Sequence, residues 1–284
     1  MSGKTADQTI RKYYNVALEL VMKCRPVAME GYEKTEAVFD TKAAYFDLVT
    51  EYDKKLEDLL ITELQKAFPE SKFIGEEDMA ANKKKPELTD VPTWIIDPID
   101  GTTNFIHRFP NWCISVGLTI RKELVVGVVY LPAVNEMYSA WMGHGAYLNG
   151  QPISVSKCTN IKSAVIGAEM SLILPAPVRD KNVKRLCKVA SNCSGCRGLG
   201  SAAVSLCYVA RGSIDCFFVE DLQAWDIAGG ALIIREAGGY VCHTKGGEFS
   251  VLKPDCIAAA TPELAKDVIA LIEEADQLTE FTFT

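Results

Sequence analysis

The sequence predicts a mixed α and β fold, built as one domain of two lobes, the first over about residues 1–150 and the second over about 151–284. Three observations predict it. Amphipathic helical patterns with capping residues open the chain. Apolar runs separated by turn residues then follow one another without intervening helices, as antiparallel strands do. After Ile153, short strands and apolar helical segments follow in turn.

The first helix is predicted by a capping-box pattern, Thr5 with Gln8, in front of a single apolar face. The residues of this face are Ile10, Tyr13, Tyr14, Ala17, Leu20, Val21 and Cys24. Pro26 comes just after the face and indicates where the helix ends. We expect this helix to pack against the core and to carry no chemistry.

A second helix is predicted after a short extended piece at residues 46–49. Thr50 and Asp53 match the capping-box spacing, and the leucines behind them share one face: Leu56, Leu59, Leu60 and Leu64. Asp53 therefore has two alternative roles, as a helix-capping acid or as a member of a functional site, and the pattern leaves both open.

Acidic residues follow the next two predicted strands. Residues 72–75 form a short strand that ends in Glu76, Glu77 and Asp78, where adjacent carboxylates repel one another unless solvent or a cation separates them. A polar, lysine-rich loop is expected over residues 80–90. A solvated turn is the alternative to a cation site at these acids.

A buried strand is predicted at residues 94–96, and Pro98 should end it because proline cannot donate to a sheet ladder. Asp97 and Asp100 then lie at the carboxyl end of the strand, where open sheets place ligands. Gly101 allows close approach of the backbone, and the next amides are free donors at a helix start. Carboxylates beside such donors suit a hard cation that holds a phosphate, with an Asx-rich turn as the alternative.

The remaining elements follow from apolar periodicity and turn residues. A hairpin is predicted from residues 114–121 and 125–131 around Lys122-Glu123, followed by a strand at 136–140. In the second half, strands are expected at 165–167, 213–219 and 257–260, and helices at 179–190, 202–210, 227–237 and 262–274. The glycine-rich segment Arg197–Ser201 precedes one of these helices but matches no nucleotide-binding fingerprint.

The composition excludes several classes of protein. A net charge of −7 argues against a nucleic-acid partner, which favours a basic face. No apolar run is long enough for a membrane span, and the first residues are too polar for a signal peptide. Ten cysteines without such a signal indicate reduced thiols in the cytoplasm. Cys193 and Cys196 form a lone C-x-x-C without the further ligands that zinc needs, so two ordinary thiols are expected, with a redox pair as the alternative.

Three separated motifs resemble those of the inositol monophosphatase family of magnesium-dependent, lithium-sensitive phosphatases. They are Gly75-Glu-Glu77, the block Trp94-Ile-Ile-Asp-Pro-Ile-Asp-Gly-Thr-Thr-Asn-Phe105, and Trp225-Asp-Ile-Ala-Gly-Gly230 with Glu236-Ala-Gly-Gly239 behind it. The middle block is highly specific, and the likeness covers nearly the whole chain. The resemblance implies a layered αβαβα sandwich of the inositol monophosphatase and fructose-1,6-bisphosphatase type, usually as a homodimer.

The resemblance also implies a role for individual residues. The expected ligands of two Mg²⁺ ions, with a third and weaker ion near Glu76, are Glu76, Asp97, the carbonyl of Ile99, Asp100 and Asp226. The residues expected to serve catalysis are Glu76, Thr102, Asp53 and Lys42, with Thr102 paired to Asp53 so that the two hold and help deprotonate the attacking water. The residues expected to bind substrate are Asp100, Gly101, Thr102, Gly200, Ser201, Ala202, Glu220 and Asp226.

The implied activity is hydrolysis of myo-inositol monophosphates to inositol and phosphate by direct in-line attack of a metal-activated water, without a covalent intermediate. Val219 departs from the family pattern, because the family's inositol-binding acid aligns there, and Glu220 replaces it only through a shifted loop or a rotated strand end. Gln223 also stands where the family often has histidine. The alternative is therefore a phosphatase for another small sugar phosphate, such as galactose 1-phosphate. A non-catalytic inositol-phosphate-binding protein is disfavoured, because the acids and Thr102 are all present.

Overall fold

The computed structural model describes residues 3–34, 38–42, 48–82 and 85–279. Its helices are α1 (Gly3–Lys23), α2 (Arg25–Tyr32), α3 (Glu51–Ala67), α4 (Glu76–Asn82), α5 (Thr102–Ile106), α6 (Ala176–Ala190), α7 (Ala202–Ala210), α8 (Ala224–Glu236) and α9 (Pro262–Asp276). Its strands are β1 (Phe39–Thr41), β2 (Leu48–Thr50), β3 (Lys72–Gly75), β4 (Thr93–Asp100), β5 (Cys113–Ile120), β6 (Glu123–Leu131), β7 (Glu136–Trp141), β8 (Ala146–Leu148), β9 (Gln151–Ile153), β10 (Val165–Ala168), β11 (Gly195–Arg197), β12 (Cys216–Val219), β13 (Tyr240–His243) and β14 (Cys256–Ala259). Two short 3-10 turns are η1 (Ile161–Ser163) and η2 (Met170–Ile173).

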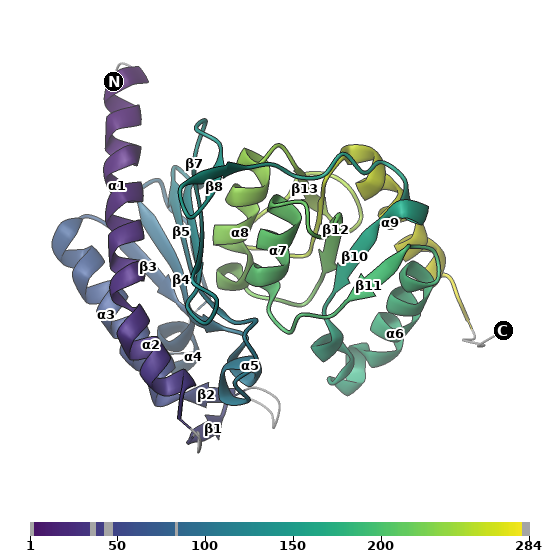
Figure 1. The fold of residues 1–284 in the computed structure, drawn as a ribbon, viewed down its shortest axis with the longest axis horizontal. Helices are drawn as coiled ribbons and strands as arrows, with labels where there is room; N and C mark the ends of the chain where they lie inside the picture. Colours follow the sequence, from purple (N-terminus) through teal and green to yellow (C-terminus); the bar gives the residue numbers. More distant parts are fainter. Residues whose placement is uncertain (1–2, 35–37, 43–47, 83–84, 280–284) are drawn as a thin grey trace.

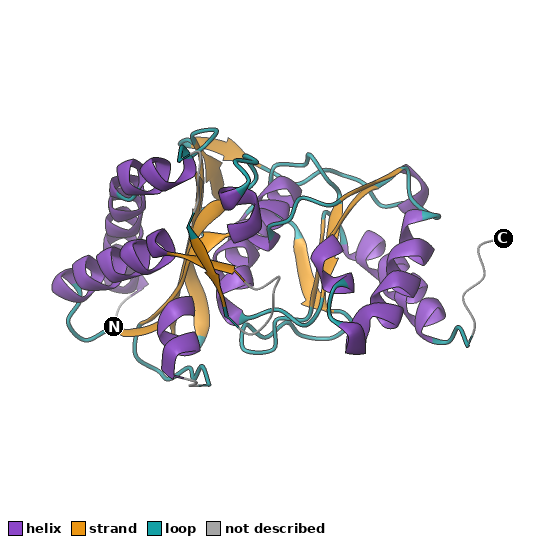
Figure 2. Cartoon of the chain, turned by 90° about the horizontal axis from the view of Figure 1, so that it is seen from below, coloured by secondary structure: helices purple, strands orange, loops and turns teal. Residues whose placement is uncertain are grey.

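These elements stack in five layers, which Figures 1 and 2 show from two directions. Helices α1 to α3 cover the outer face of a large sheet, α7 and α8 lie between the two main sheets, and α6 and α9 cover the outer face of the second sheet. The apolar core follows the same layers, with one buried cluster under α1 to α3, one around α7 and α8, and one under α6 and α9. The expectation of a mixed α and β fold with a layered αβαβα arrangement is confirmed.

The large sheet contains seven strands among the described residues, in the order β3-β4-β5-β6-β7-β8-β9. Only its β3–β4 pair is parallel, and the other neighbours are antiparallel. The predicted hairpin is β5–β6. Its turn lies one residue earlier than expected, at Arg121 and Lys122, whose φ angles of 53° and 68° are those of a hairpin turn with two left-handed residues.

Strand β4 runs further than the sequence indicated, because Pro98 does not end it. The neighbouring strand β3 pairs only with residues 93–96 of β4. Pro98 therefore lies beyond the last hydrogen bond to β3, where its missing N–H breaks no pairing. On the other side, the register with β5 shifts between Asp97 and Asp100, which marks a β-bulge. The bulge accommodates the proline at the carboxyl end of the strand, between the two acids.

The predicted helices are present, with several differences in extent. Helix α6 begins at Ala176 instead of 179, and α8 begins at Ala224 instead of 227. Helix α4 runs to Asn82, into the loop expected over residues 80–90. Helix α1 ends at Lys23, as Pro26 indicated, but Pro26 opens the separate helix α2 because a proline fits a first helical turn. Glu76, Glu77 and Asp78 form the first turn of α4, where acids complement the helix dipole, instead of a solvated turn. The strand expected at 213–219 begins only at Cys216. The side chain of Thr5 and residues 46–47 lie outside the described part of the chain.

The second sheet has the order β11-β10-β12-β14-β13. Strand β10 is parallel to both β11 and β12, and β14 is antiparallel to β12 and β13. Phe217 and Val219 of β12 point toward α7 and α8, since they belong to the buried cluster around those helices. Cys216 and Phe218 point toward α6 and α9, as strand alternation requires.

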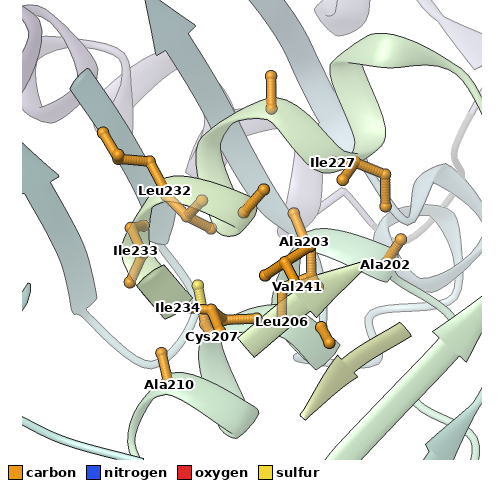
Figure 3. Packing of buried hydrophobic residues seen from close by; sticks show 14 of the residues in the cluster. Ala202, Ala203, Leu206, Cys207, Ala210, Ile227, Leu232, Ile233, Ile234 and Val241 are labelled. Atoms are coloured by element: carbon orange, nitrogen blue, oxygen red, sulfur yellow. The ribbon is translucent and has the colours of Figure 1, made fainter. Parts of the chain in front are cut away.

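Helix α8 lies very close to the large sheet, in the central layer that Figure 3 shows. A Cβ atom added at Gly117 would lie 2.8 Å from the Cβ of Ala228, and one added at Gly127 would overlap the carbonyl oxygen of Gly229. On the other side of α8, a Cβ at Gly230 would lie 2.6 Å from Leu206 of α7. The glycines therefore set how near α8 lies to β5, β6 and α7.

The helices of the described residues include none with the length and apolar character needed to cross a lipid bilayer.

Candidate active site

Three carboxylates from two separate parts of the chain meet at one point. Asp97 and Asp100 come from the bulged end of β4, and Asp226 comes from the first turn of α8. One oxygen from each lies within 4.8 Å of the other two. Like charges this close and this buried cannot all be ionised without a cation or protons between them. The structure thus brings together three of the residues that the sequence indicated as metal ligands.

Asp97 is the most buried of the three acids and only 1% exposed. Its Oδ1 atom accepts a hydrogen bond from the amide of Ile99 at 3.0 Å, which fixes the carboxylate within the bulge. Burial raises the pKa of Asp97 far above its ordinary value, and the charges of Glu76, Asp100 and Asp226 raise it further. A cation would remove this electrostatic penalty.

Asp100 is connected to the start of α7. Its Oδ2 atom accepts hydrogen bonds from the Ser201 hydroxyl and the Ala203 amide, both at 2.6 Å. Burial raises the pKa of Asp100 to about 6, although these two hydrogen bonds act to lower it. The charges of Glu169 and Glu76 add to the rise. Asp100 therefore lies between the acids of the site and the N-terminus of helix α7.

Asp226 both caps a helix and belongs to the acid group. Its Oδ2 atom accepts a hydrogen bond from the amide of Gln223 at 2.6 Å, as a helix-capping acid does. The same carboxylate belongs to the group formed with Asp97 and Asp100. Burial raises the pKa of Asp226 well above its ordinary value, followed by the charges of Asp100 and Glu76.

Glu76 lies next to this group and is held by Lys42. The Lys42 ammonium is 2.7 Å from Glu76 and 2.6 Å from Glu77. Burial alone would lower the pKa of Lys42, but its two acidic neighbours outweigh burial and raise it. Lys42 thus places one positive charge beside a cluster of acids that are otherwise uncompensated.

Glu57 of α3 is a residue of this region that the sequence reasoning missed. It is 3% exposed, and its two oxygens accept hydrogen bonds from the amides of Glu77, at 2.9 Å, and Asp78, at 2.8 Å. A Cβ at Gly75 would lie 2.5 Å from the Glu57 carboxyl carbon, so a side chain there would displace the Glu57 carboxylate. Burial raises the pKa of Glu57 to about 7. The sequence signal for Glu57 was its position four residues after Asp53, which places the two acids on the same face of α3.

Asp53 and Thr102 were expected to form a pair. Asp53 Oδ2 instead accepts hydrogen bonds from the amide and hydroxyl of Thr50, at 2.8 Å and 2.6 Å. The Thr102 hydroxyl donates to the carbonyl of Ile99 at 3.1 Å. Among the described residues, Asp53 Oδ1 is buried without a hydrogen-bond partner. Burial raises the pKa of Asp53 to about 7. The open position at Oδ1 suits a water molecule or other donor.

The residues expected to hold the phosphate lie at two neighbouring turns. Gly101, with φ 90°, precedes α5, and Gly200, with φ 73°, precedes α7. A Cβ at Gly101 would lie 3.1 Å from the Gly200 carbonyl oxygen and 3.2 Å from the Ser201 side chain. The turns at Gly101-Thr102 and Gly200-Ser201-Ala202 are thereby brought together beside Asp100.

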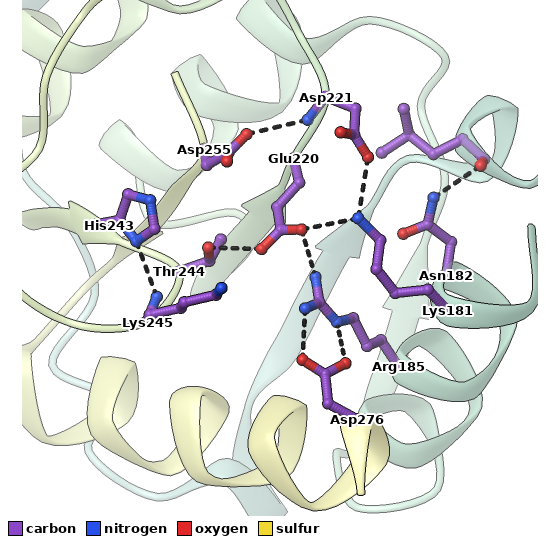
Figure 4. A network of polar contacts seen from close by, with 11 residues as sticks. Lys181, Asn182, Arg185, Glu220, Asp221, His243, Thr244, Lys245, Asp255 and Asp276 are labelled. Carbon is purple, nitrogen blue, oxygen red and sulfur yellow. Dashed lines mark hydrogen bonds and ion pairs between the residues drawn. The ribbon is translucent and has the colours of Figure 1, made fainter. Parts of the chain in front are cut away.

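Glu220 differs from its expected position. It follows Val219, so strand alternation turns it to the α6 and α9 side of the second sheet, away from the carboxylate group (Figure 4). Its Oε2 atom contacts Lys181 at 3.0 Å and Arg185 at 2.6 Å, and its Oε1 atom accepts from Thr244 at 2.6 Å. Burial would raise the pKa of Glu220, but these three partners lower it to about 2. Glu220 thus links helix α6 to Thr244 after β13. None of these contacts involves the three carboxylates, so they do not support the expectation that Glu220 replaces the family's acid at Val219.

Cys193 and Cys196 are both free thiols. Cys193 donates to the carbonyls of Ala190 and Gly195, and Cys196 lies in β11.

Comparisons with known proteins add to this geometry. A sequence profile of the inositol monophosphatase family matches residues 9–277. Inositol monophosphatase 3 of Solanum lycopersicum is 41% identical over 267 residues, which cover 94% of this chain and 98% of the relative. Inositol monophosphatase 1 of Homo sapiens is 40% identical over 260 residues, covering 90% and 92%. The solved structure of extragenic suppressor protein suhB from Bartonella henselae has a TM-score of 0.82 at 32% identity and covers 92% of this chain and 98% of its own.

Proposed function

Since the chain belongs to the inositol monophosphatase family of phosphoric monoester hydrolases, we propose that it hydrolyses myo-inositol monophosphates to inositol and phosphate with Mg²⁺. The observation that carries the proposal is the meeting of Asp97, Asp100 and Asp226 within 4.8 Å, beside the turn at Gly101. Buried acids next to backbone donors suit a cation that holds a phosphate ester.

The donor atoms fit Mg²⁺. The proposed ligands, namely Glu76, Asp97, the Ile99 carbonyl, Asp100 and Asp226, offer only oxygen, whereas zinc prefers nitrogen and sulfur. These residues would hold two ions, which is the number we propose, with a third and weaker ion near Glu76. The acid pair Glu76 and Glu77 supports this third site, because it already attracts the positive charge of Lys42.

The protein groups around the acids suit in-line hydrolysis without a covalent intermediate. When bound, Mg²⁺ neutralises the phosphate charge and lowers the pKa of water. We assign Thr102 and Asp53 to hold that water, because the Thr102 hydroxyl faces the Ile99 carbonyl and Asp53 Oδ1 has an open position. The Asp53 pKa of about 7 suits a group that takes up a proton near neutral pH. The amides of Gly101 and Thr102 are assigned to the phosphate oxygens.

Phosphate release from myo-inositol 1-phosphate tests this function. We expect turnover with Mg²⁺, none with EDTA, and inhibition by lithium. A panel that includes galactose 1-phosphate ranks kcat/KM and decides between an inositol phosphatase and a broader sugar phosphatase, the alternative that Val219 favours. An absence of turnover with every ester, together with tight binding of inositol 1-phosphate, would support a non-catalytic binding protein instead.

Two further proposals concern the setting of the enzyme. All ten cysteines are free thiols, as expected in a reducing compartment, and we place the enzyme in the cytoplasm. We also propose a homodimer, as the family resemblance implies. Light scattering after gel filtration should give twice the mass of 31.1 kDa, and a monomer at micromolar concentration would contradict the dimer.

A further inference from the structure

Glu169 is a further acid near the site, since its charge acts on Asp100. It directly follows β10, whose residue Ala168 pairs in parallel with Phe218 of β12. Glu169 itself is still extended, with φ −92° and ψ 111°. Because the chain is still extended at Glu169, the parallel β10–β12 register continues for one more residue, and Glu169 lies beside Val219.

The side chain of Glu169 belongs to the inner side of the second sheet. Two residues earlier, a Cβ at Gly167 would lie 3.1 Å from the ring of Phe217, which points toward α7 and α8. Alternation gives residue 169 the same side as residue 167. The next residue, Met170, packs on the turn before α7, since a Cβ at Gly198 would lie 2.8 Å from its Cγ. That turn leads to Ser201, which holds Asp100.

One oxygen of Glu169 has no partner among the described residues. Oε1 accepts hydrogen bonds from the amide and hydroxyl of Ser171, at 3.1 Å and 2.9 Å, whereas Oε2 is buried and unpaired. An unpaired buried carboxylate oxygen is costly, which points to a bound donor that satisfies it. The Glu169 carboxylate lies close enough to Asp100 for its charge to raise the pKa of that acid, as expected for a side chain on the side of the acid group.

The neighbouring acid Glu220 cannot supply this function, because both of its oxygens are already used. They bind Lys181, Arg185 and Thr244 on the other side of the sheet, as Figure 4 shows. Val219, which is 1% exposed, offers only an apolar surface. Beside Val219, the acid with a free oxygen on the inner side of the sheet is therefore Glu169.

We infer that Glu169 accepts a hydrogen bond from a hydroxyl of the substrate's alcohol and so selects polyhydroxylated esters; this inference rests on the proposed phosphatase function. In the free enzyme a water molecule satisfies Oε2, and a substrate hydroxyl takes its place. A buried acceptor built for a hydroxyl disfavours an alcohol that lacks one, because that acceptor would then stay unpaired. The substrate class is thus polyol and sugar monophosphates, in preference to aryl or simple alkyl phosphates.

The test compares one hydroxylated and one unhydroxylated ester. We expect Glu169→Gln to lower kcat/KM for myo-inositol 1-phosphate about tenfold or more, mainly through KM, because a weaker acceptor replaces the carboxylate. Hydrolysis of 4-nitrophenyl phosphate and the Mg²⁺ concentration for half-maximal activity should change less than about twofold. Glu220→Gln tests the neighbouring acid as the alternative. It should leave the ratio of the kcat/KM values for the two substrates as in the wild type.

Three results would overturn the inference: an unchanged substrate ratio in Glu169→Gln, an equal loss on both substrates, or a changed ratio in Glu220→Gln alone. If the wild type hydrolyses neither ester, the proposed function fails by itself. Calorimetric titration with the same two esters then decides about Glu169. The inference stands if Glu169→Gln selectively weakens binding of inositol 1-phosphate, and it fails if binding is unchanged or both esters weaken equally.

Discussion

Glu57 Oε2 accepts a hydrogen bond from the amide of Glu77 at 2.9 Å, which connects helix α3 to the first turn of α4. The second oxygen of Glu57 binds the next amide, at Asp78. Glu76, a proposed metal ligand, is the first residue of that same turn. The position of Glu76 therefore depends on a carboxylate that does not itself belong to the group of three acids.

Replacing Glu57 with Gln should weaken the site without removing a ligand. Gln keeps the size of the side chain, but it has only one acceptor oxygen for the two amides. We expect the Mg²⁺ concentration for half-maximal phosphate release to rise about tenfold, as is typical when support of a metal ligand is lost. Glu63→Gln, on the exposed side of α3, is the matched control and should leave it unchanged. An unaltered Mg²⁺ dependence in Glu57→Gln would contradict this role.

Replacing Asp97 with Asn should separate the functional from the structural role of the acid cluster. Because Asp97 is a buried ligand shared by the acid cluster, we expect phosphate release to fall at least about a thousandfold. The metal-free protein should become more stable at neutral pH, since Asn avoids the cost of protonating or burying this carboxylate. Activity assays and thermal unfolding in EDTA measure the two effects. A variant that loses both activity and thermal stability would instead indicate that Asp97 mainly holds the fold of the bulge.

The stability of the metal-free protein should decrease as pH rises. Burial raises the pKa of Asp100 to about 6 and of Asp53 and Glu57 to about 7, above their ordinary values. The folded state therefore binds more protons than the unfolded state between about pH 4 and pH 7, and stability is lost across that window.

Mg²⁺ should reverse this trend, because it binds the ionised acids. We expect Mg²⁺ to raise Tm more at pH 8 than at pH 5.5. Thermal unfolding at both pH values, with Mg²⁺ or EDTA, measures the difference. Asp100→Asn should reduce the loss of stability in EDTA. A metal-free Tm that is flat or rises over this range would contradict the prediction.

Glu220 should have the opposite pH dependence. Its pKa of about 2 lies below the ordinary 4.5, so its contribution is complete above pH 4.5 and is lost as pH falls toward 2. Glu220→Gln should lower the free energy of unfolding by about 2–3 kcal/mol at pH 7. The difference from the wild type should shrink between pH 5 and pH 3, as measured by urea unfolding. A difference that stays constant over this range would mean that the Glu220 charge does not stabilise the fold.

Local signals explain which parts of the fold the sequence predicts well. Thr50 and Asp53 cap α3 as expected, and α7 begins and ends where its small apolar residues do. Strands β8, β9, β11 and β13 were missed, because glycine, asparagine or proline stands in or beside each of them and favours a turn. The predicted end of β4 at Pro98 was wrong, because the bulge that accommodates this proline depends on the lengths of the neighbouring strands.

The sequence predicted those site residues that belong to a recognisable motif. Asp97, Asp100 and Asp226 come together as expected, although more than a hundred residues separate the first and the last. Glu57 has no motif of its own, and its role arises only when α4 meets α3. The direction of Glu220 depends on strand alternation at β12, which a shift of one residue would reverse.

The contact of Gly117 and Gly127 with α8 has a consequence for protein engineering. Even a methyl group at either glycine would push α8 outward, and Asp226 at its start would move away from Asp97. Libraries that aim at new substrates should therefore keep this contact fixed and vary the segment around Glu169 and Val219. The same contact limits evolutionary drift, because a neutral path through larger side chains at these positions would first have to rebuild the whole central layer.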